Sequence, residues 1–191
     1  MKTVVKILLM MVAYLAIFIA GASSGIIHPM CYAYIGAVLP LLCAFVYLYT
    51  STLIRGFGVA TALNGFILVL FLLGGETDPS FIIGIVALTA ISEIVRLCLR
   101  YDTLKGVRWS FVPFAFSFFA YTIHWWTDTE GSLAAAVEEM PAGYDELMKQ
   151  VIDNIPVLII VLVLTIPISI IAMRMAEHAM KKKQGNSLTL N

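Results

Sequence analysis

Long runs of apolar residues with almost no charge recur along the whole chain and leave little room for a soluble fold. Hydrophobic side chains make up 61% of the 191 residues and charged side chains only 13%, whereas about a quarter is usual for soluble domains. A run of roughly twenty apolar residues is the length of helix that crosses the hydrocarbon of a bilayer. We therefore expect an all-α integral membrane protein.

Six such runs predict six membrane-spanning helices in a single domain that covers residues 1–191. The predicted spans are about residues 4–21, 30–49, 53–73, 81–99, 107–126 and 155–175, and one long outer loop covers residues 127–154. Pro40 and Pro167 lie inside their spans, where a proline removes a backbone hydrogen bond and should kink the helix. Pro79 and Pro156 lie near helix starts, where the missing N–H costs little.

The long loop is expected to hold helical pieces of its own. Ser132 is a plausible N-cap, and one helical face is predicted from the spacing of Tyr144, Leu147, Met148 and Val151. We expect this piece to lie across the mouth of the bundle or in the membrane interface.

The first apolar run also has the layout of a secretory signal peptide, because Lys2 and Lys6 precede it and small residues at 20–22 offer a cleavage site. No soluble domain that needs export follows, so we expect a first membrane helix. Ala13, Ala16 and Ala20 recur on it at three- and four-residue spacing. Small residues on one face let another helix approach closely, either in a partner protein or inside the bundle.

Lysine and arginine are unevenly distributed between the connectors, and membrane proteins keep these residues on the cytoplasmic side. With the N-terminus inside, eleven of the twelve basic residues are cytoplasmic and Lys149 alone faces outward. The cytoplasmic set is Lys2, Lys6, Arg55, Arg96, Arg100, Lys105, Arg108, Arg174, Lys181, Lys182 and Lys183. Both termini are therefore expected in the cytoplasm, and the acidic connectors and long loop are expected outside.

Glu93 is the clearest ionisable residue inside a predicted span, where a charge is costly and by default suggests function. Arg96 follows three residues later, near the cytoplasmic end of the same helix. We expect an ion pair between them that reaches toward the interface. The alternative, a proton relay, needs further buried carboxylates or histidines on the same path, and the other spans offer none.

Aromatic and histidine side chains gather at the predicted outer face. Tyr and Trp at a membrane boundary usually form the aromatic belt of the bilayer, and we assign Trp126 to that belt. The belt does not explain two histidines on one face. We therefore predict a cavity there that stacks and hydrogen-bonds a small organic molecule. Its expected residues are His28, Tyr32, Tyr121, His124, Trp125 and Tyr144.

Signatures of catalysis and of cofactor binding are weak or missing. His28 and His124 leave a metal or haem site open, although metal sites normally need more ligands. Cys31, Cys43 and Cys98 are expected at different depths, which indicates neither a disulfide nor a metal-binding pair. The sequence has no HExxH, GxSxG, Walker A or glycine-rich nucleotide motif. We expect no catalytic residue, no cofactor and no ATP hydrolysis in this chain.

Residues that resemble a known family are spread along the chain. They are the alanine-rich first helix, the ISEIVR stretch of the fourth, the acidic loop with GYDELMKQV, and the last helix, IPVLIIVLVLTIPISIIAMRMAEHAMKKK. With six predicted helices and an inside N-terminus, the whole chain resembles the substrate-binding S components of energy-coupling factor transporters. It is most similar to the Trep_Strep family, also called MptD-like.

The resemblance implies uptake across the plasma membrane of a prokaryote. An S component captures a small organic micronutrient outside the cell, such as a vitamin, a cofactor precursor or a siderophore-like chelator. It then docks on a membrane coupling subunit driven by two cytoplasmic ATPases and topples to release its ligand inside. Ala16 and Ala20 match the Ala-x-x-x-Ala face that docks on the coupling subunit in this class.

Two other functions stay open. One is a small membrane-embedded enzyme, whose candidates His124 and Glu93 are expected on opposite sides of the bilayer, where they cannot cooperate. The other is an assembly subunit without a ligand, which the absence of a ligand-sized cavity would favour.

Overall fold

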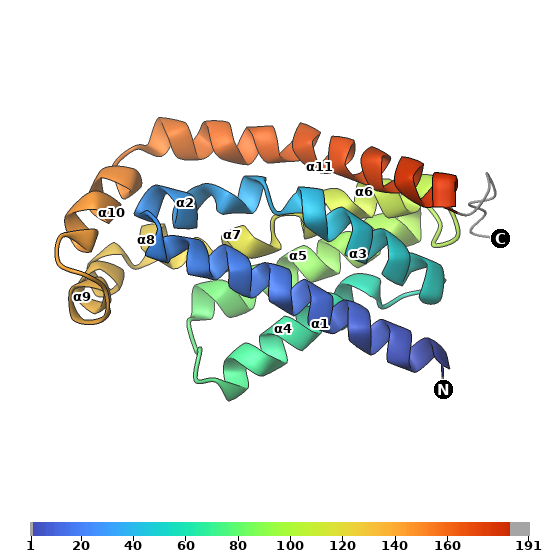
Figure 1. The fold of residues 1–191 in the computed structure, drawn as a ribbon, viewed down its shortest axis with the longest axis horizontal. Helices are drawn as coiled ribbons and strands as arrows, with labels where there is room; N and C mark the ends of the chain where they lie inside the picture. The colour runs from blue at the N-terminus through green and yellow to red at the C-terminus, as the bar shows by residue number, and fades with distance from the viewer. Residues whose placement is uncertain (1, 184–191) are drawn as a thin grey trace.

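The computed structural model describes residues 2–183, and this part of the chain folds into helices without a strand (Figure 1). The long helices are α1 (Lys2–Ser23), α3 (Pro40–Leu53), α4 (Val59–Leu73), α5 (Pro79–Cys98), α6 (Leu104–Phe114) and α11 (Ile155–Lys183). The shorter ones are α2 (Pro29–Tyr34), α7 (Ser117–Thr122), α8 (His124–Thr127), α9 (Thr129–Glu139) and α10 (Tyr144–Ile152), with two 3₁₀ turns, η1 (Ser24–Ile26) and η2 (Ile35–Ala37). In Figure 1, α9 and α10 lie at the end of the molecule opposite to the start of α1.

Among residues 2–183, three helices are long and apolar enough to cross a membrane: α1 together with η1, α5, and α11. A fourth crossing arises if α2, η2 and α3 are one span, bent by 41° near Pro40, where α3 begins. The kink predicted at Pro40 is therefore confirmed, because proline lacks the N–H that a continuous helix uses. α11 continues through Pro167 as one helix. Pro79 and Pro156 lie in the first turns of α5 and α11, as predicted.

The other two predicted spans are short or interrupted. α4 holds 15 residues and begins at Val59, not at Leu53, because the chain turns at Gly58, whose φ of 115° suits glycine. The predicted span 107–126 is divided into α6, α7 and α8. Pro113 lies at the end of α6, and its carbonyl accepts from the amide of Phe116 at 3.2 Å in a tighter turn. Helices thus occur in all the predicted places, but not as six continuous spans.

Side-chain hydrogen bonds connect four helices inside the apolar core. Asn64 of α4 accepts from the Tyr14 hydroxyl of α1 at 2.9 Å. Its amide nitrogen donates to Thr89 of α5 and to Ser117 of α7, at 2.9 Å each. Asn64 is 1% exposed, and a buried amide must find its partners within the protein. These bonds therefore fix how α1, α5 and α7 sit against α4.

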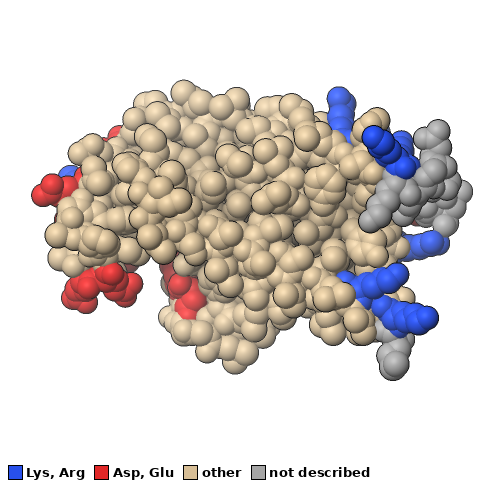
Figure 2. Space-filling view, viewed as in Figure 1, with Lys and Arg blue, Asp and Glu red and all other residues tan. Residues whose placement is uncertain are grey.

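Charged side chains separate toward the two ends of the molecule (Figure 2). Lys and Arg gather at the end where α1 begins and α11 approaches its last turn, and Asp and Glu gather at the end that carries α9 and α10. At the basic end, Arg108 of α6 forms an ion pair with Glu177 of α11. Arg108 Nη2 donates to Glu177 Oε2 at 2.7 Å, and Arg108 Nε donates to Glu177 Oε1 at 3.1 Å. The molecule therefore has a basic end and an acidic end along its long axis.

Glu93 does not pair with Arg96 among the described residues, so the predicted ion pair was wrong. Glu93 Oε1 accepts from the backbone amides of Ala60 at 2.8 Å and Thr61 at 3.2 Å, and so caps the first turn of α4 from α5. The first amides of a helix lack partners within it, and a negative charge there complements the helix dipole. Glu93 is 3% exposed and Arg96 is fully buried, so neither side chain reaches toward the interface.

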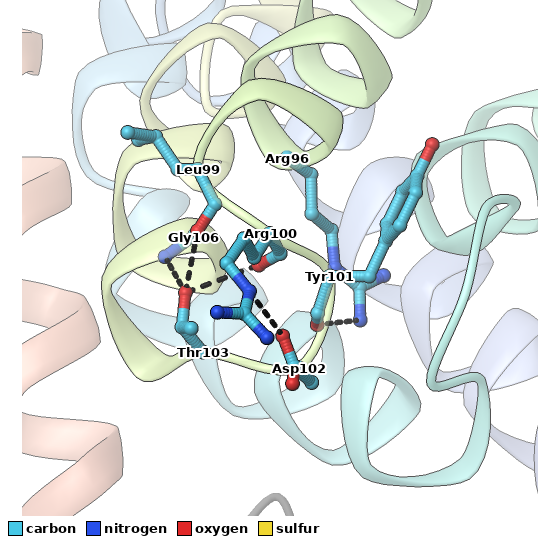
Figure 3. A network of polar contacts seen from close by, with 7 residues as sticks. All are labelled: Arg96, Leu99, Arg100, Tyr101, Asp102, Thr103 and Gly106. Atoms are coloured by element: carbon cyan, nitrogen blue, oxygen red, sulfur yellow. Dashed lines mark hydrogen bonds and ion pairs between the residues drawn. The ribbon is translucent and has the colours of Figure 1, made fainter.

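Arg96 instead supports the turn between α5 and α6 (Figure 3). Its Nη2 donates to the carbonyls of Ile54 at 3.0 Å and Tyr101 at 3.3 Å, and the guanidinium carbon lies 5.7 Å from the Tyr101 ring centre. In the same turn, Thr103 caps α6 by accepting from the Gly106 amide at 2.9 Å. Arg96, which was expected to reach toward the membrane interface, is therefore buried and stabilises the connector between α5 and α6.

The predicted helical content of the long loop is confirmed by α9 and α10. The N-cap of α9 is Asp128 and not Ser132, because Asp128 Oδ1 accepts from the Gly131 amide at 3.3 Å. Ser132 lies inside the helix and is buried. An aspartate in this position satisfies a free amide and places its charge at the positive end of the helix.

α10 packs against α2 and α9. The predicted face of α10 needs one change, because Leu147 is 42% exposed and the buried set is Tyr144, Met148, Val151 and Ile152. The hydroxyl of Tyr34 donates to the carbonyl of Val151, and Trp126 Nε1 donates to the carbonyl of Ile152, both at 3.3 Å. Trp126 is therefore held against α10, and its assignment to the lipid belt stays a prediction.

Candidate functional site

A cavity of about 420 Å³ opens at the acidic end of the bundle. Its wall is formed by η1 and α2, by the connector that precedes α5, by α7 and α8, and by α9 with the first residue of α10. Small-molecule sites in proteins usually have volumes of about 300–1,000 Å³. The cavity is therefore large enough for a ligand of vitamin size.

The structure brings five of the six predicted pocket residues together around this cavity: Tyr32, Tyr121, His124, Trp125 and Tyr144. The sixth, His28, is exposed and does not belong to the described wall. Its Nδ1 accepts from the amide of Met30 at 3.1 Å, so it is the N-cap of α2, ahead of Pro29. A local helix-capping role accounts for this histidine.

The aromatic rings of the wall support one another. The ring of Tyr32 stands almost perpendicular to those of Tyr121 and Trp125, at 88° and 89°, with ring centres 6.2 Å apart in both pairs. Tyr121 also lies 5.3 Å from Phe71 and 5.6 Å from Phe81. Edge-to-face contacts of this kind are favourable and restrict each ring. The wall is therefore formed before any ligand enters.

The side chain of His124 connects α8 to α9 through a hydrogen bond. Its Nδ1 lies 2.8 Å from Ser132 Oγ, and Ser132 Oγ also donates to the His124 carbonyl at 3.2 Å. One assignment satisfies both bonds: Nδ1 carries the ring proton and Nε2 is an acceptor. His124 is the first residue of α8, after α7 ends at Thr122. Burial lowers the pKa of its imidazole, so the ring is neutral at neutral pH.

Tyr144 closes the cavity from α10. Its hydroxyl is close to η1, since a Cβ on Gly25 would lie 3.3 Å from it and 3.4 Å from the ring of Tyr32. Burial raises the pKa of the Tyr144 phenol, so it stays protonated at neutral pH. The Tyr144 hydroxyl and Trp125 Nε1 are buried without a hydrogen-bond partner among residues 2–183. Both therefore have unused capacity beside the cavity.

Sequence reasoning missed the carboxylates of the wall, Glu76, Asp78, Asp128 and Glu139. The sequence marks them only as acidic residues expected on the outer side. No local signal brings the connector before α5 to the start and end of α9, because that arrangement depends on packing between segments far apart in the chain. The acidic composition of the outer connectors was the available clue.

The three alanines of α1 do not share one environment. Ala16 and Ala20 are exposed, on the face of α1 that carries Val12 and Ile19, which are 54% and 50% exposed. Ala13 is partly buried and packs against the hydrophobic core. The exposed small-residue face predicted for docking is therefore limited to Ala16 and Ala20.

Metal ligands do not gather in the described part of the chain, where no group of three or more His, Cys, Asp and Glu is placed to hold an ion. His28 caps α2 while His124 bonds Ser132, so the two histidines do not act on one centre. Cys31 and Cys98 are exposed, Cys43 is buried, and all three are unpaired thiols.

Comparison with known proteins agrees with the membrane character of this bundle. No curated protein and no solved structure matches the chain. A family model described as a hypothetical bacterial integral membrane protein (Trep_Strep) matches residues 1–183. The chain therefore belongs to the Trep_Strep family and is a multi-pass integral membrane protein of a prokaryote.

Proposed function

We propose that this protein is the substrate-binding S component of an energy-coupling factor importer. It captures a small organic micronutrient outside the cell and passes it to a membrane coupling subunit driven by two cytoplasmic ATPases. It acts as a binding protein, without catalytic residues or cofactor of its own. The observation that carries the proposal is the open, aromatic-walled cavity of about 420 Å³ at the acidic end of the bundle.

The proposed topology has six crossings with both termini in the cytoplasm. α1, α5 and α11 cross as long helices, α2–α3 cross as a bent pair, and α4 and the α6–α7 pair complete the set. The gathering of Lys and Arg at the end opposite to the cavity supports this orientation, because basic residues remain on the cytoplasmic side. The cavity then opens to the outside, where a captured solute enters.

Docking on the coupling subunit is assigned to the exposed face of α1 that carries Ala16 and Ala20. Helices in a bilayer associate closely where small side chains let their backbones approach. Ala13 supports this face from the core side and does not contact the partner.

The test is co-expression with the coupling subunit and ATPases of the same genome. We expect the tagged chain to co-purify with these subunits and to support ATP-dependent uptake into membrane vesicles. Ala16→Trp and Ala20→Trp should abolish co-purification while the isolated protein keeps its fold and its ligand affinity. Leu8→Trp is the matched control, because Leu8 is already bulky and 50% exposed on the same helix.

Three results would count against the proposal. A chain that never co-purifies with a coupling subunit is not an S component. Loss of folding in both alanine variants would place these residues in internal packing. Full uptake by both variants would remove α1 as the docking face.

A further inference from the structure

Four carboxylates line the cavity: Glu76, Asp78, Asp128 and Glu139. Backbone amides hold three of them in place. Asp78 accepts from the amides of Ser80 and Phe81 at 3.2 and 3.0 Å, Asp128 from Gly131 at 3.3 Å, and Glu76 from Asp78 at 3.2 Å. These bonds therefore fix the positions of three of the four carboxylates in the site.

Positive charge to balance them is missing from the described wall, which contains neither Lys nor Arg. Lys149, the one basic residue predicted on this side, is exposed on α10 and lies 3.7 Å from Asp153. His124 is the remaining basic group of the wall, and burial keeps it neutral. The cavity therefore carries a net negative potential, which an anionic ligand would oppose.

Two buried polar atoms of the wall also indicate a ligand. Trp125 is 4% exposed and Tyr144 is 7% exposed, and neither Trp125 Nε1 nor the Tyr144 hydroxyl has a partner among residues 2–183. Buried polar groups are normally hydrogen-bonded, and an indole N–H can only donate. Trp125 therefore requires an acceptor atom, and a ligand in the cavity is the available source.

The aromatic walls add a third requirement. Tyr32, Tyr121 and Trp125 meet edge to face, and cations bind favourably over the faces of such rings. A bare metal ion does not suit this wall, since the described residues form no ligand group for one. An organic cation uses the rings and the carboxylates together.

We infer that the cavity selects an organic cation: a protonated or quaternary nitrogen on an aromatic or apolar body, with an acceptor oxygen or nitrogen for Trp125 Nε1. The inference rests on the proposed capture function and adds the charge class of its substrate. The nitrogen lies toward Glu139 and the other carboxylates, and the apolar body lies between Tyr32, Tyr121 and Trp125.

Three related probes that share a hydroxyphenyl ring compare the effect of charge: tyramine is a cation, tyrosol is its neutral analogue, and phloretate, with a slightly longer chain, is an anion. Their affinities for the purified full-length protein in lipid nanodiscs can be measured by calorimetry at low ionic strength. We expect tyramine to bind about tenfold or more tighter than tyrosol, and phloretate to bind least. Salt should reduce the preference for tyramine, because it screens the carboxylates.

Two neighbouring glutamates on α9 provide the matched variants. Both are exposed, but Glu139 lines the cavity and Glu138 does not belong to the described wall. Glu139→Gln should reduce the preference for tyramine over tyrosol, and Glu138→Gln should leave it unchanged. Trp125→Phe removes the N–H and keeps a ring, so it should weaken tyramine but not phenethylamine, which lacks the phenol oxygen.

The outcomes are decisive in both directions. Equal or tighter binding of tyrosol or phloretate, or no binding of tyramine at millimolar concentration, overturns the cation inference. An equal loss of preference in the Glu138 and Glu139 variants overturns it as well, because a general surface charge then explains the effect. Co-purification with the coupling subunit does not depend on ligand charge, so the proposed function is judged separately.

Discussion

Substitution of Glu93 tests how the start of α4 is stabilised. Glu93→Ala removes the acceptor of two backbone amides, those of Ala60 and Thr61, in a site where the glutamate is 3% exposed. A hydrogen bond to a charged group contributes about 1.5–3 kcal/mol, so losing one short and one longer bond costs about 3 kcal/mol. For a chain of this length each kcal/mol lowers Tm by about 2–4 °C, which predicts a decrease of about 6–12 °C.

Glu93→Gln separates the acceptor from the charge. The glutamine carbonyl oxygen can accept from the same two amides, and only the charge assistance is lost. We expect a cost of about 1 kcal/mol, or about 2–4 °C in Tm. Glu138→Ala, on the exposed surface of α9, is the control and should leave Tm unchanged.

Both variants can be compared in one detergent by heating the purified protein and measuring the fraction that remains monodisperse in size-exclusion chromatography. Equal decreases in Tm for Glu93→Ala and Glu93→Gln would refute the capping role, because an ion pair with Arg96 depends on charge alone. No decrease in Glu93→Ala would refute any stabilising role of this carboxylate.

Three further predictions concern orientation and the cavity. In a background without native cysteines, Glu138→Cys should react with an impermeant maleimide from outside and Lys105→Cys only after permeabilisation; the reverse pattern would overturn the topology. Gly25→Leu should abolish binding of tyramine, because a Cβ at this buried position would lie 3.3 Å from the Tyr144 hydroxyl and a larger side chain would disturb the wall; unchanged binding would place the ligand elsewhere. His124→Ala should weaken tyramine binding about tenfold, and His178→Ala on the exposed surface of α11 should not; equal affinities in both, by calorimetry, would remove His124 from the site.

The positions of helices were predictable from sequence, whereas their continuity was not. Apolar runs mark where helices form, because burial in lipid needs an internally hydrogen-bonded backbone. The breaks at residues 54–58 and at 115–116 depend on local turns near Gly58 and Pro113 that an apolar composition does not reveal. The prediction succeeded at Pro40, where a proline in mid-span coincides with a bend.

The aromatic side of the candidate site was also readable from sequence. Tyr121, His124 and Trp125 follow one another closely on one short segment, so local geometry already brings them to one end of the bundle. His28 precedes α2 near the same end of the bundle, but its Nδ1 accepts from the amide of Met30 and so caps α2. Several polar side chains lie close together in the sequence here, and competing local hydrogen bonds decide which of them line the cavity. The spacing of residues in the sequence does not show which of these hydrogen bonds form.

Sequence alone predicts that this chain is a membrane protein with a basic end and an acidic end. Hydropathy and the distribution of Lys and Arg depend on which residues each segment contains. They direct how the helices insert into the membrane, independently of how the helices later pack. Helix packing, which the sequence pattern does not reveal, places Glu93 at the start of α4 and brings Glu76, Asp128 and Glu139 around one cavity. Those contacts join segments distant in the chain, and their formation depends on how the helices pack in three dimensions.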